Sequence, residues 1–311
     1  HEGIGEADRT EVLHLAERAL AGLPMRCQMV YRQERTWRSF VNSRGIEAEE
    51  FGTTYELYAE LVVEGRKLSH RIASRRFSDI ASLPFGTELR RRVEPLLRRL
   101  PAVPSLPVVL EPRVVASLFR TLAPAFAADA IAKGGSFLKD HLGKAIGSPI
   151  FHLTDDAGMV GGLYTTAFDD RGVPPIPVTL LKEGVVTGLY HDPESARAAG
   201  LRPTGHYRDG LLQPSNLILR PGARTRNVTL GELGNYLVLD QSPPMDLRSG
   251  ELNGPLDLVV VERGEKKGSI RRDFRAPITK VLRAIQEVVS DQERSCEVDA
   301  PTAIFAPGFG A

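Results

Sequence analysis

The sequence predicts an α+β protein with two domains, an N-terminal α/β domain whose helices cover a mostly antiparallel sheet and a β-rich C-terminal domain. Alternating apolar and polar residues near the N-terminus are typical of strands that bury one face, and helical patterns flank them. A proline-rich segment, residues 101–107, then precedes a part of the chain in which strand patterns dominate. We therefore place the domains at residues 1–104 and 105–311.

The N-terminal domain is predicted to combine helices with hairpin-forming strands. The predicted elements are a helix over 7–22, a strand over 25–31, a second strand through Trp37 and Val41, a hairpin over 53–75 and a helix over 87–100. Glu64-Gly65 is the expected turn of the hairpin, because a glycine-containing pair between two alternating runs is typical of one. We interpret the arginines of the last helix, residues 90–92 and 98–99, as a solvated face.

The C-terminal domain is predicted to consist mostly of strands, with one helical stretch near its start and one helix near its end. The first stretch covers residues 113–132, and Pro124 is expected to interrupt it because proline lacks the backbone N–H that a helix needs. The late helix is predicted over residues 276–291. The predicted strands cover residues 107–112, 148–156, 177–192 with a turn at Glu183-Gly184, 215–222, 235–240, 256–274 and 301–310.

Composition favours a cytoplasmic protein without a strong attraction to nucleic acid or to membranes. The 40 basic and 39 acidic residues leave a formal net charge of +1 when the histidines are neutral. Cys27 and Cys296 are far apart and form no C-x-x-C pair, which excludes a disulfide framework and a cysteine-rich zinc module. The sequence has no apolar run near the roughly 18 residues that a membrane-spanning helix needs.

The first six residues, HEGIGE, come close to H-E-x-x-x-H, a pattern in which two histidines bind zinc and a glutamate acts as general base. Glu6 stands where the second histidine would be. Elsewhere in the sequence, no two histidines have the spacing of zinc ligands on a helix. We therefore interpret HEGIGE as a coincidence.

Two pairs of carboxylates, Asp155-Asp156 and Asp169-Asp170, suit either turns or acid–base and metal chemistry. Turn residues follow each pair, and aspartate is favoured in turns because its side chain bonds nearby backbone amides. We therefore interpret both pairs as turn residues. The alternative is a self-sufficient, metal-dependent hydrolase in which these carboxylates act with His191 or His206.

A series of longer motifs runs through most of the chain, and its order is more specific than any single member. The motifs are VNSRGIEAEEFGTTYEL, PVVLEPRVVASLF, KGGSFLKDHLGKAIGSP, HLTDDAGMVGG, FDDRGVPP, LLKEGVVTGLYHD, RPTGHYRDG and QPSNLILRPG. From about residue 35 onward, this order resembles the TldD/PmbA family, the "modulator of DNA gyrase" peptidases. The resemblance implies a C-terminal domain of that type. Family members usually carry roughly a hundred more residues before the NSRG segment than the about forty of this sequence, so the resemblance implies an N-terminal domain that is shortened relative to the family.

The family that the sequence resembles contains a zinc-bearing kind of subunit and a TldE/PmbA-like kind that lacks the zinc ligands. In the zinc-bearing kind, H-E-x-x-x-H follows the VVL strand, and a cysteine near the C-terminus completes the site. Here these positions fall on Arg120, Thr121 and Ala125, and neither arginine nor alanine can ligate zinc. Cys296 lies closer to the terminal strand than the family's cysteine, and we interpret it as a small, partly buried hydrophobic residue.

The resemblance therefore implies a subunit with no cofactor and no catalytic residue of its own. We expect it to pair with a TldD-like zinc subunit in a heterodimer that cleaves unfolded or modified peptides, which includes the maturation of peptide natural products. An extended peptide can add to a sheet edge with little demand on sequence. The family's historical name suggests a nucleic-acid or gyrase-associated module as another alternative, against which the balanced charge argues. The expected channel residues are Thr204, Gly205, His206, Tyr207, Ser215 and Asn216.

Overall fold

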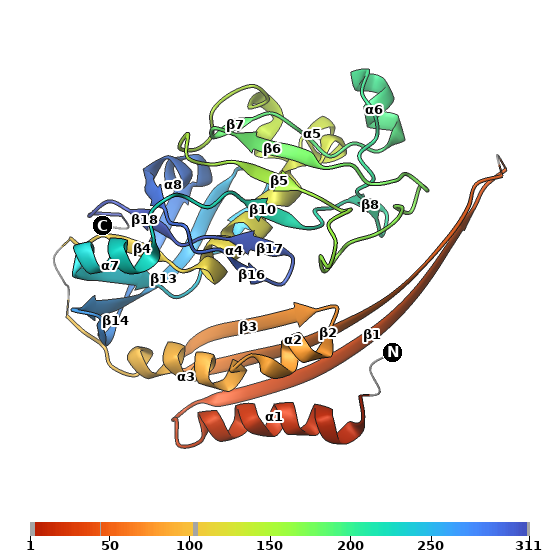
Figure 1. Cartoon of the computed structure of the whole chain (residues 1–311). Coiled ribbons are helices and arrows are strands. Elements are labelled where there is room, and N and C mark those ends of the chain that lie inside the picture. Colours follow the sequence, from red (N-terminus) through yellow and green to blue (C-terminus); the bar gives the residue numbers. More distant parts are fainter. Residues whose placement is uncertain (1–3, 44, 102–104, 310–311) are drawn as a thin grey trace.

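The computed structural model describes residues 4–43, 45–101 and 105–309 of the chain. It has the mixed α and β structure that the sequence predicts, with an N-terminal sheet below a larger C-terminal body (Figure 1). Within those ranges, no helix has the length and hydropathy of a transmembrane segment. His1 and Glu2 of the HEGIGE segment lie outside the described residues, and Glu6 is the first residue of helix α1.

The N-terminal unit is an antiparallel sheet in the order β1-β2-β3 with helices on one face (Figure 1). Leu57 of β2 is buried on that face in one cluster with Leu89 and Val93 of α3. Glu64 and Gly65 have positive φ values of 48° and 72°, which confirms the predicted hairpin turn. The elements are α1 (Glu6–Leu20), β1 (Arg26–Val41), β2 (Glu47–Val63), β3 (Arg66–Ser74), α2 (Phe77–Ser82) and α3 (Phe85–Leu96).

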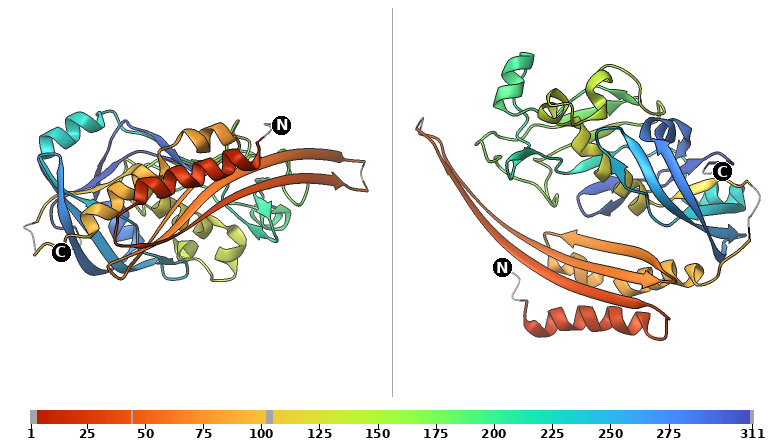
Figure 2. Two further views of the ribbon diagram at one scale, coloured as in Figure 1. Left: turned by 90° about the horizontal axis from the view of Figure 1, so that it is seen from below. Right: turned by 180° about the vertical axis from the view of Figure 1, so that it is seen from behind.

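β1 is one continuous strand where the sequence predicts two, and with β2 it projects from the molecule as an arm (Figures 1 and 2). Pairing of β2 with β3 ends at Tyr55 and Ser74, so the described part of the arm beyond this pair has only two strands. Its outer face exposes Trp37 and Phe51, which are 61% and 74% accessible and lie opposite each other in the ladder. Isolated two-stranded ribbons are marginally stable in water, so the stability of the arm depends on the contacts of its inner face.

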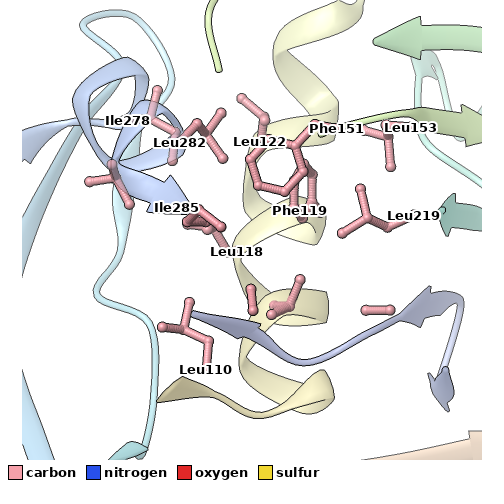
Figure 3. Close-up of a cluster of buried hydrophobic side chains, with 14 of the residues drawn as sticks. Leu110, Leu118, Phe119, Leu122, Phe151, Leu153, Leu219, Ile278, Leu282 and Ile285 are labelled. Carbon is pink, nitrogen blue, oxygen red and sulfur yellow. The ribbon is translucent and has the colours of Figure 1, made fainter. Parts of the chain in front are cut away.

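The C-terminal body packs two sheets against helix α4 (Pro112–Leu122). Figure 3 shows Leu118, Phe119 and Leu122 of α4 among side chains of both sheets, such as Leu110 and Leu219. The first sheet has the order β12-β13-β11-β4-β18-β15, with β14 paired to β13. Its strands are β4 (Val108–Leu110), β11 (Asn235–Leu239), β12 (Met245–Asp246), β13 (Glu251–Glu262), β14 (Glu265–Pro277), β15 (Ile285–Val288) and β18 (Ala303–Phe305).

The second sheet has the order β16-β17-β10-β5-β6-β7. Positive φ values at Glu183 and Gly184 confirm the turn predicted between β6 and β7. Its strands are β5 (Leu153–Asp155), β6 (Val178–Lys182), β7 (Val185–Val186), β10 (Leu217–Leu219), β16 (Glu293–Ser295) and β17 (Val298–Ala300). The remaining elements are η1 (Ala123–Phe126), α5 (Ala128–Ala132), η2 (Phe137–Asp140), α6 (Pro193–Ala199), β8 (Tyr207–Arg208), β9 (Leu211–Leu212) and α7 (Arg226–Leu233).

The two predicted helical segments of the C-terminal body have different outcomes. As expected, the helix that begins at residue 112 ends before Pro124, which lies in the 3₁₀ segment η1. The helix predicted over 276–291 is wrong in its second half: α8 (Ile278–Ala284) is followed directly by β15. Ile285 and Val288 are buried and pair with β18, so pairing with a distant strand overrides the local helical pattern.

The N-terminal and C-terminal units share a hydrophobic core. Side chains on one face of the first C-terminal sheet, among them Val109, Val238 and Val259, belong to the same cluster as the residues of α1, α3 and β2. The other face of that sheet covers α4. The predicted domain boundary at 104/105 falls beside residues 102–104, which lie outside the described part of the chain, and it stays a prediction.

Two buried arginines also join the units. Arg92 of α3 is buried and donates two hydrogen bonds of 2.9 Å to the carboxylate of Asp240, just after β11. Arg66, at the start of β3, is 1% accessible and lies 3.3 Å from Asp257 of β13. The interpretation of residues 90–92 as a solvated face is therefore wrong for Arg92. The helix turns this side chain inward, where its buried partner compensates the charge.

Candidate functional site

A cleft lies between the inner face of the arm and the loops of the C-terminal body. We call it the distal hollow, and its volume is about 330 Å³. Thr36 and Gly52 line it from the arm, and Tyr164 and Tyr207 line it from the body. The guanidinium carbon of Arg208 lies 4.6 Å from the centre of the Tyr164 ring, which holds that aromatic side chain at the wall.

Two further hollows extend this cleft along the N-terminal sheet. The middle hollow, of about 160 Å³, shares Glu34, Thr54, Leu163 and Tyr164 with the distal hollow. The proximal hollow, of about 350 Å³, shares Arg71 with the middle hollow and reaches the free edge of β3. Neighbouring hollows share wall residues, so they follow one another between the sheet and the body, and we call the series the groove.

A buried carboxylate, Asp155, organises the body side of the distal hollow. It accepts hydrogen bonds from the hydroxyl of Tyr190 at 2.7 Å and from the backbone N–H groups of Ser215 and Asn216 at 2.8 and 2.9 Å. The Ser215 hydroxyl donates to it as well. Nε2 of His206 lies 3.6 Å from it, an ion-pair distance that is too long for a hydrogen bond.

The environment of Asp155 keeps its carboxyl group ionised. Burial alone would raise the pKa of this group, but His206 and the hydroxyls of Ser215 and Tyr190 lower it below its usual value. Its lone pairs are already used by protein donors, so Asp155 is not available as a free metal ligand or base. It serves instead to hold two loops and a histidine in place.

The turn interpretation of the aspartate pairs is confirmed for Asp156 and Asp169 and is incomplete for Asp155 and Asp170, whose side chains accept hydrogen bonds from distant residues. Asp156 accepts a hydrogen bond from the N–H of Gly158, and Asp169 accepts from Arg171, two residues later in each case. Asp169 also accepts from the N–H of Tyr207, which ties the two loops of the distal hollow together. Asp155 instead accepts a hydrogen bond from Ser215, which is 60 positions away in the sequence. The residues next to Asp155 in the sequence do not indicate this contact.

The structure brings together four of the six expected channel residues. Gly205, His206, Tyr207 and Ser215 line the distal hollow, although His206 and Ser215 are themselves buried, and Thr204 and Asn216 are buried without lining it. Gly205 has a φ of 72°, and a Cβ there would lie 2.6 Å from a backbone atom of the neighbouring Pro175. The loop therefore needs glycine at this point. Whether these residues contact a substrate stays a prediction.

The arm is fastened to the body at the distal hollow. Arg38 of β1 donates to Glu50 of β2 at 2.7 Å and to Asp170 of the body at 2.7 Å. Glu50 in turn accepts from the N–H of Ala167 at 2.7 Å. The ring of Phe40 lies 6.0 Å from that of Phe168, measured between centroids. These contacts, which we call the arm latch, close the distal hollow on one side.

We expect Arg38→Ala to loosen the arm, because it removes the charge-assisted bonds that join the arm to Asp170 and Glu50. Amide hydrogen exchange in the distal halves of β1 and β2 should become faster on the order of tenfold. Trp37 is the single tryptophan of the sequence, so its fluorescence anisotropy decay reports the same motion.

Arg35→Ala is the matched control, since Arg35 is exposed on the same strand and has no ion-pair partner among the described residues. Unchanged exchange in the Arg38 variant, or an equal increase in both variants, would contradict the arm latch.

Arg120 is one of the three positions that the resemblance assigns to metal ligands, and it belongs to a group of ion pairs, which we call the ion-pair site. Arg120 of α4 donates to the carboxylate of Glu297 and, at 2.8 Å, to the carbonyl of Ser295. Arg71 of β3 lies 3.6 Å from the same glutamate. Thr121 donates to the carbonyl one turn earlier in its helix, and Ala125 is fully buried in η1.

Cys296 lies beside this ion-pair site although it is distant from Arg120 in the sequence. Its thiol is buried and contacts the carbonyl of Arg71 at 3.5 Å. Burial and the neighbouring Glu297 raise the pKa of the thiol to about 11, although Arg71 and Arg120 act in the opposite direction. Cys296 is therefore a buried protonated thiol at neutral pH, in agreement with its interpretation as a small hydrophobic residue.

The side chains at these positions do not fit a zinc ion. A guanidinium has no lone pair to donate and alanine offers no ligand atom, so Cys296 lacks the histidine ligands that would complete a zinc site with it. Nor do the described residues elsewhere contain a group of three or more His, Cys, Asp and Glu side chains placed to hold a metal. Sequence reasoning did not identify Tyr190, Arg71 or Glu297, because no local motif marks them.

The C-terminal body is similar to a known family of proteins. A family model described as the PmbA/TldA metallopeptidase C-terminal domain matches residues 104–308. A metalloprotease of Methanocaldococcus jannaschii is 28% identical over 242 residues, which cover 73% of this chain and 54% of that protein. The metalloprotease PmbA of Escherichia coli O157:H7 is 32% identical over 117 residues, 38% of this chain and 26% of that protein. The chain thus spans about half or less of the length of these relatives.

Solved structures show the same fold. A Thermotoga maritima protein described as a modulator of DNA gyrase superposes with a TM-score of 0.83 and 24% identity, over 98% of this chain and 74% of that chain. TldE from Thermococcus kodakarensis superposes with a TM-score of 0.76 and 21% identity over the same shares of each chain, 98% and 74%. At these identities the likeness establishes the architecture, which includes the N-terminal sheet.

Proposed function

The chain belongs to the PmbA/TldA metallopeptidase family, and from this premise we propose that it is the metal-free, TldE/PmbA-like subunit of a two-subunit cytoplasmic peptidase. In this proposal a TldD-like subunit supplies the zinc, and the two subunits together cleave unfolded or modified peptides. The observation that carries the proposal is the pair formed by Arg120 and Glu297. It puts a permanent cation at the position where the resemblance places the first zinc-binding histidine.

The groove beneath the N-terminal sheet supports the substrate part of this proposal. β1 is an edge strand, and its inner face lines the distal hollow with Glu34, Thr36 and Arg38. The proximal hollow reaches the free edge of β3, where an extended peptide is able to pair through backbone hydrogen bonds, which make little demand on its sequence. The proposed substrates are therefore peptides without stable structure, including precursors of peptide natural products.

Zinc content and peptidase activity test the proposed division of roles. We expect the purified chain to contain no stoichiometric zinc and to leave an unstructured test peptide intact. After addition of a TldD-like protein from the same organism, the complex should contain one zinc and cleave the peptide. Elemental analysis of the separated complex and mass spectrometry of the products measure both quantities.

The control for this experiment is the TldD-like protein alone, with and without a chelator. Cleavage that needs both proteins and is lost with the chelator supports the proposal. Stoichiometric zinc and chelator-sensitive cleavage by the chain alone would overturn it and would favour the hydrolase alternative with His191 or His206.

A further inference from the structure

The proximal hollow has a wall rich in cations. Among the described residues, seven arginine or lysine side chains line it, against three glutamates. Five of the seven cations form ion pairs, partly with carboxylates outside the lining such as Asp240 and Asp299. The hollow lies between α3 and β3 on one side and β14 and β16 on the other, so distant parts of the sequence create the charge.

Two of these cations are available to a ligand. Arg92 and Arg113 are bound to Asp240, and Arg294 is bound to Asp299. Arg91 and Lys266, in contrast, are exposed, and within the described residues neither forms a salt bridge, although Lys266 is close enough to Glu111 to help lower the pKa of that carboxyl group. The ammonium of Lys266 donates to the backbone carbonyl of Arg91 at 3.2 Å, and both residues line the hollow.

The acidic residues of the hollow are bound to other side chains than Arg91. Glu111 lies 3.3 Å from Arg113 and 3.4 Å from Arg226. Glu293 lies 3.9 Å from Arg226, and Glu88 lies 3.2 Å from Nε2 of His70. A negatively charged group that enters the hollow therefore meets Arg91 and Lys266 as the cations that form no salt bridge among the described residues.

We propose that the proximal hollow binds a carboxylate group of the peptide, with Arg91 and Lys266 as its cationic partners. This inference rests on the proposed function for its ligand. A peptide that runs along the groove passes Arg71, which lines both the middle and the proximal hollow. The carboxylate is either the C-terminus of the peptide or the side chain of an acidic residue, and both have the same chemistry.

Fluorescence anisotropy with matched peptides tests this carboxylate subsite. The probes are a fluorescein-labelled ten-residue Gly-Ser-Ala peptide with a free C-terminus, the same peptide with an amidated C-terminus, and an amidated version with one Glu. At low salt we expect a free carboxylate to tighten binding roughly tenfold, because hydrogen bonds to charged groups contribute that much. The free C-terminus and the Glu peptide distinguish the two sources of the carboxylate.

The double variant Arg91→Gln/Lys266→Gln should lose the preference for a carboxylate. It should bind all three probes with the affinity that the wild type has for the amidated peptide without Glu. The matched control is Arg98→Gln/Lys267→Gln, which removes two charges from the same parts of the chain but outside the hollow. It should retain the preference. Increasing salt should weaken the preference as well, since exposed charges are screened.

The possible failures are distinguishable. If peptides bind but a carboxylate gives no advantage, or if both double variants lose it equally, the carboxylate subsite is overturned and the proposed function stands. If no peptide binds, the peptide groove of the proposed function fails. In that case, calorimetric titration with N-acetylglutamate tests the carboxylate subsite. Binding of N-acetylglutamate that the variant Arg91→Gln/Lys266→Gln loses supports the subsite, and absence of binding overturns it.

Discussion

Asp155→Asn is expected to destabilise the fold by about 3–5 kcal/mol, because it leaves two buried hydrogen-bond donors without an acceptor, each at a cost of about 1–3 kcal/mol. The carboxylate receives hydrogen bonds from Tyr190, Ser215 and Asn216 and lies beside His206. An asparagine amide can accept at one oxygen only, so its NH₂ group would face donors that need an acceptor. The free energy of unfolding in urea, measured by circular dichroism, checks this prediction.

Asp156→Asn is the matched control for Asp155, since Asp156 neighbours it and bonds only a local backbone N–H. A change within about 0.5 kcal/mol is expected for this surface residue. Equal effects of both substitutions would contradict the organising role of Asp155. The Asp155 variant should also lose affinity for peptides, because Ser215 and His206 line the distal hollow.

The pH dependence of stability gives an independent check on Asp155. Its pKa in the folded protein is lowered, so its contribution to stability is present above the unfolded value of about 3.9. The contribution is lost as the pH falls below that value and through the folded pKa. Unfolding measured between about pH 6 and pH 2 should therefore show less acid-dependent loss in Asp155→Asn than in the wild type.

Asp240→Asn is the second substitution with a large expected effect, again about 3–5 kcal/mol. Asp240 is 1% accessible and accepts bonds from Arg92 at 2.9 Å and from Arg113 at 3.0 Å. Removing its charge leaves the buried guanidinium of Arg92 without compensation at the contact between α3 and the C-terminal body. The free energy of unfolding and hydrogen exchange in α3 measure the loss.

A double variant distinguishes the loss of the ion pair from a general intolerance of this position. Arg92→Met/Asp240→Leu replaces the buried pair by apolar groups of similar size, which is often neutral in other proteins, and Arg113 keeps Glu111 as its partner at 3.3 Å. The free energy of unfolding of this double variant should be closer to that of the wild type than to that of Asp240→Asn. Asp246→Asn, at an exposed turn of the same sheet, should have little effect. A double variant as unstable as Asp240→Asn would contradict the ion-pair explanation.

The fold was predictable where the sequence carries a local signal. The hairpin turn at Glu64-Gly65, the alternation along β2 and the helix that ends before Pro124 depend on a few adjacent residues. The late helix was predicted too long, because Ile285 pairs with a strand that lies further along the chain. Length and pairing of strands are tertiary properties, and a local pattern does not contain them.

The candidate site was predictable only in part. The TGHYR and PSN segments do lie together, and four of their residues line the distal hollow, although their contact with a substrate stays a prediction. The residue that holds them together, Asp155, looks like a turn aspartate in the sequence. Its buried role depends on Ser215, 60 positions away, and that distance is invisible to any short window.

The sequence by itself determined the family, the order of most elements and the absence of histidine at the positions of Arg120 and Ala125. Only the tertiary structure decided that Arg120 pairs with Glu297, 177 positions away, and that α3 and β14 together form the cationic wall of the proximal hollow. The physical reason is that helical and strand periodicity act over a few residues. Burial, ion pairs and hollows depend instead on which distant segments the sheets place side by side.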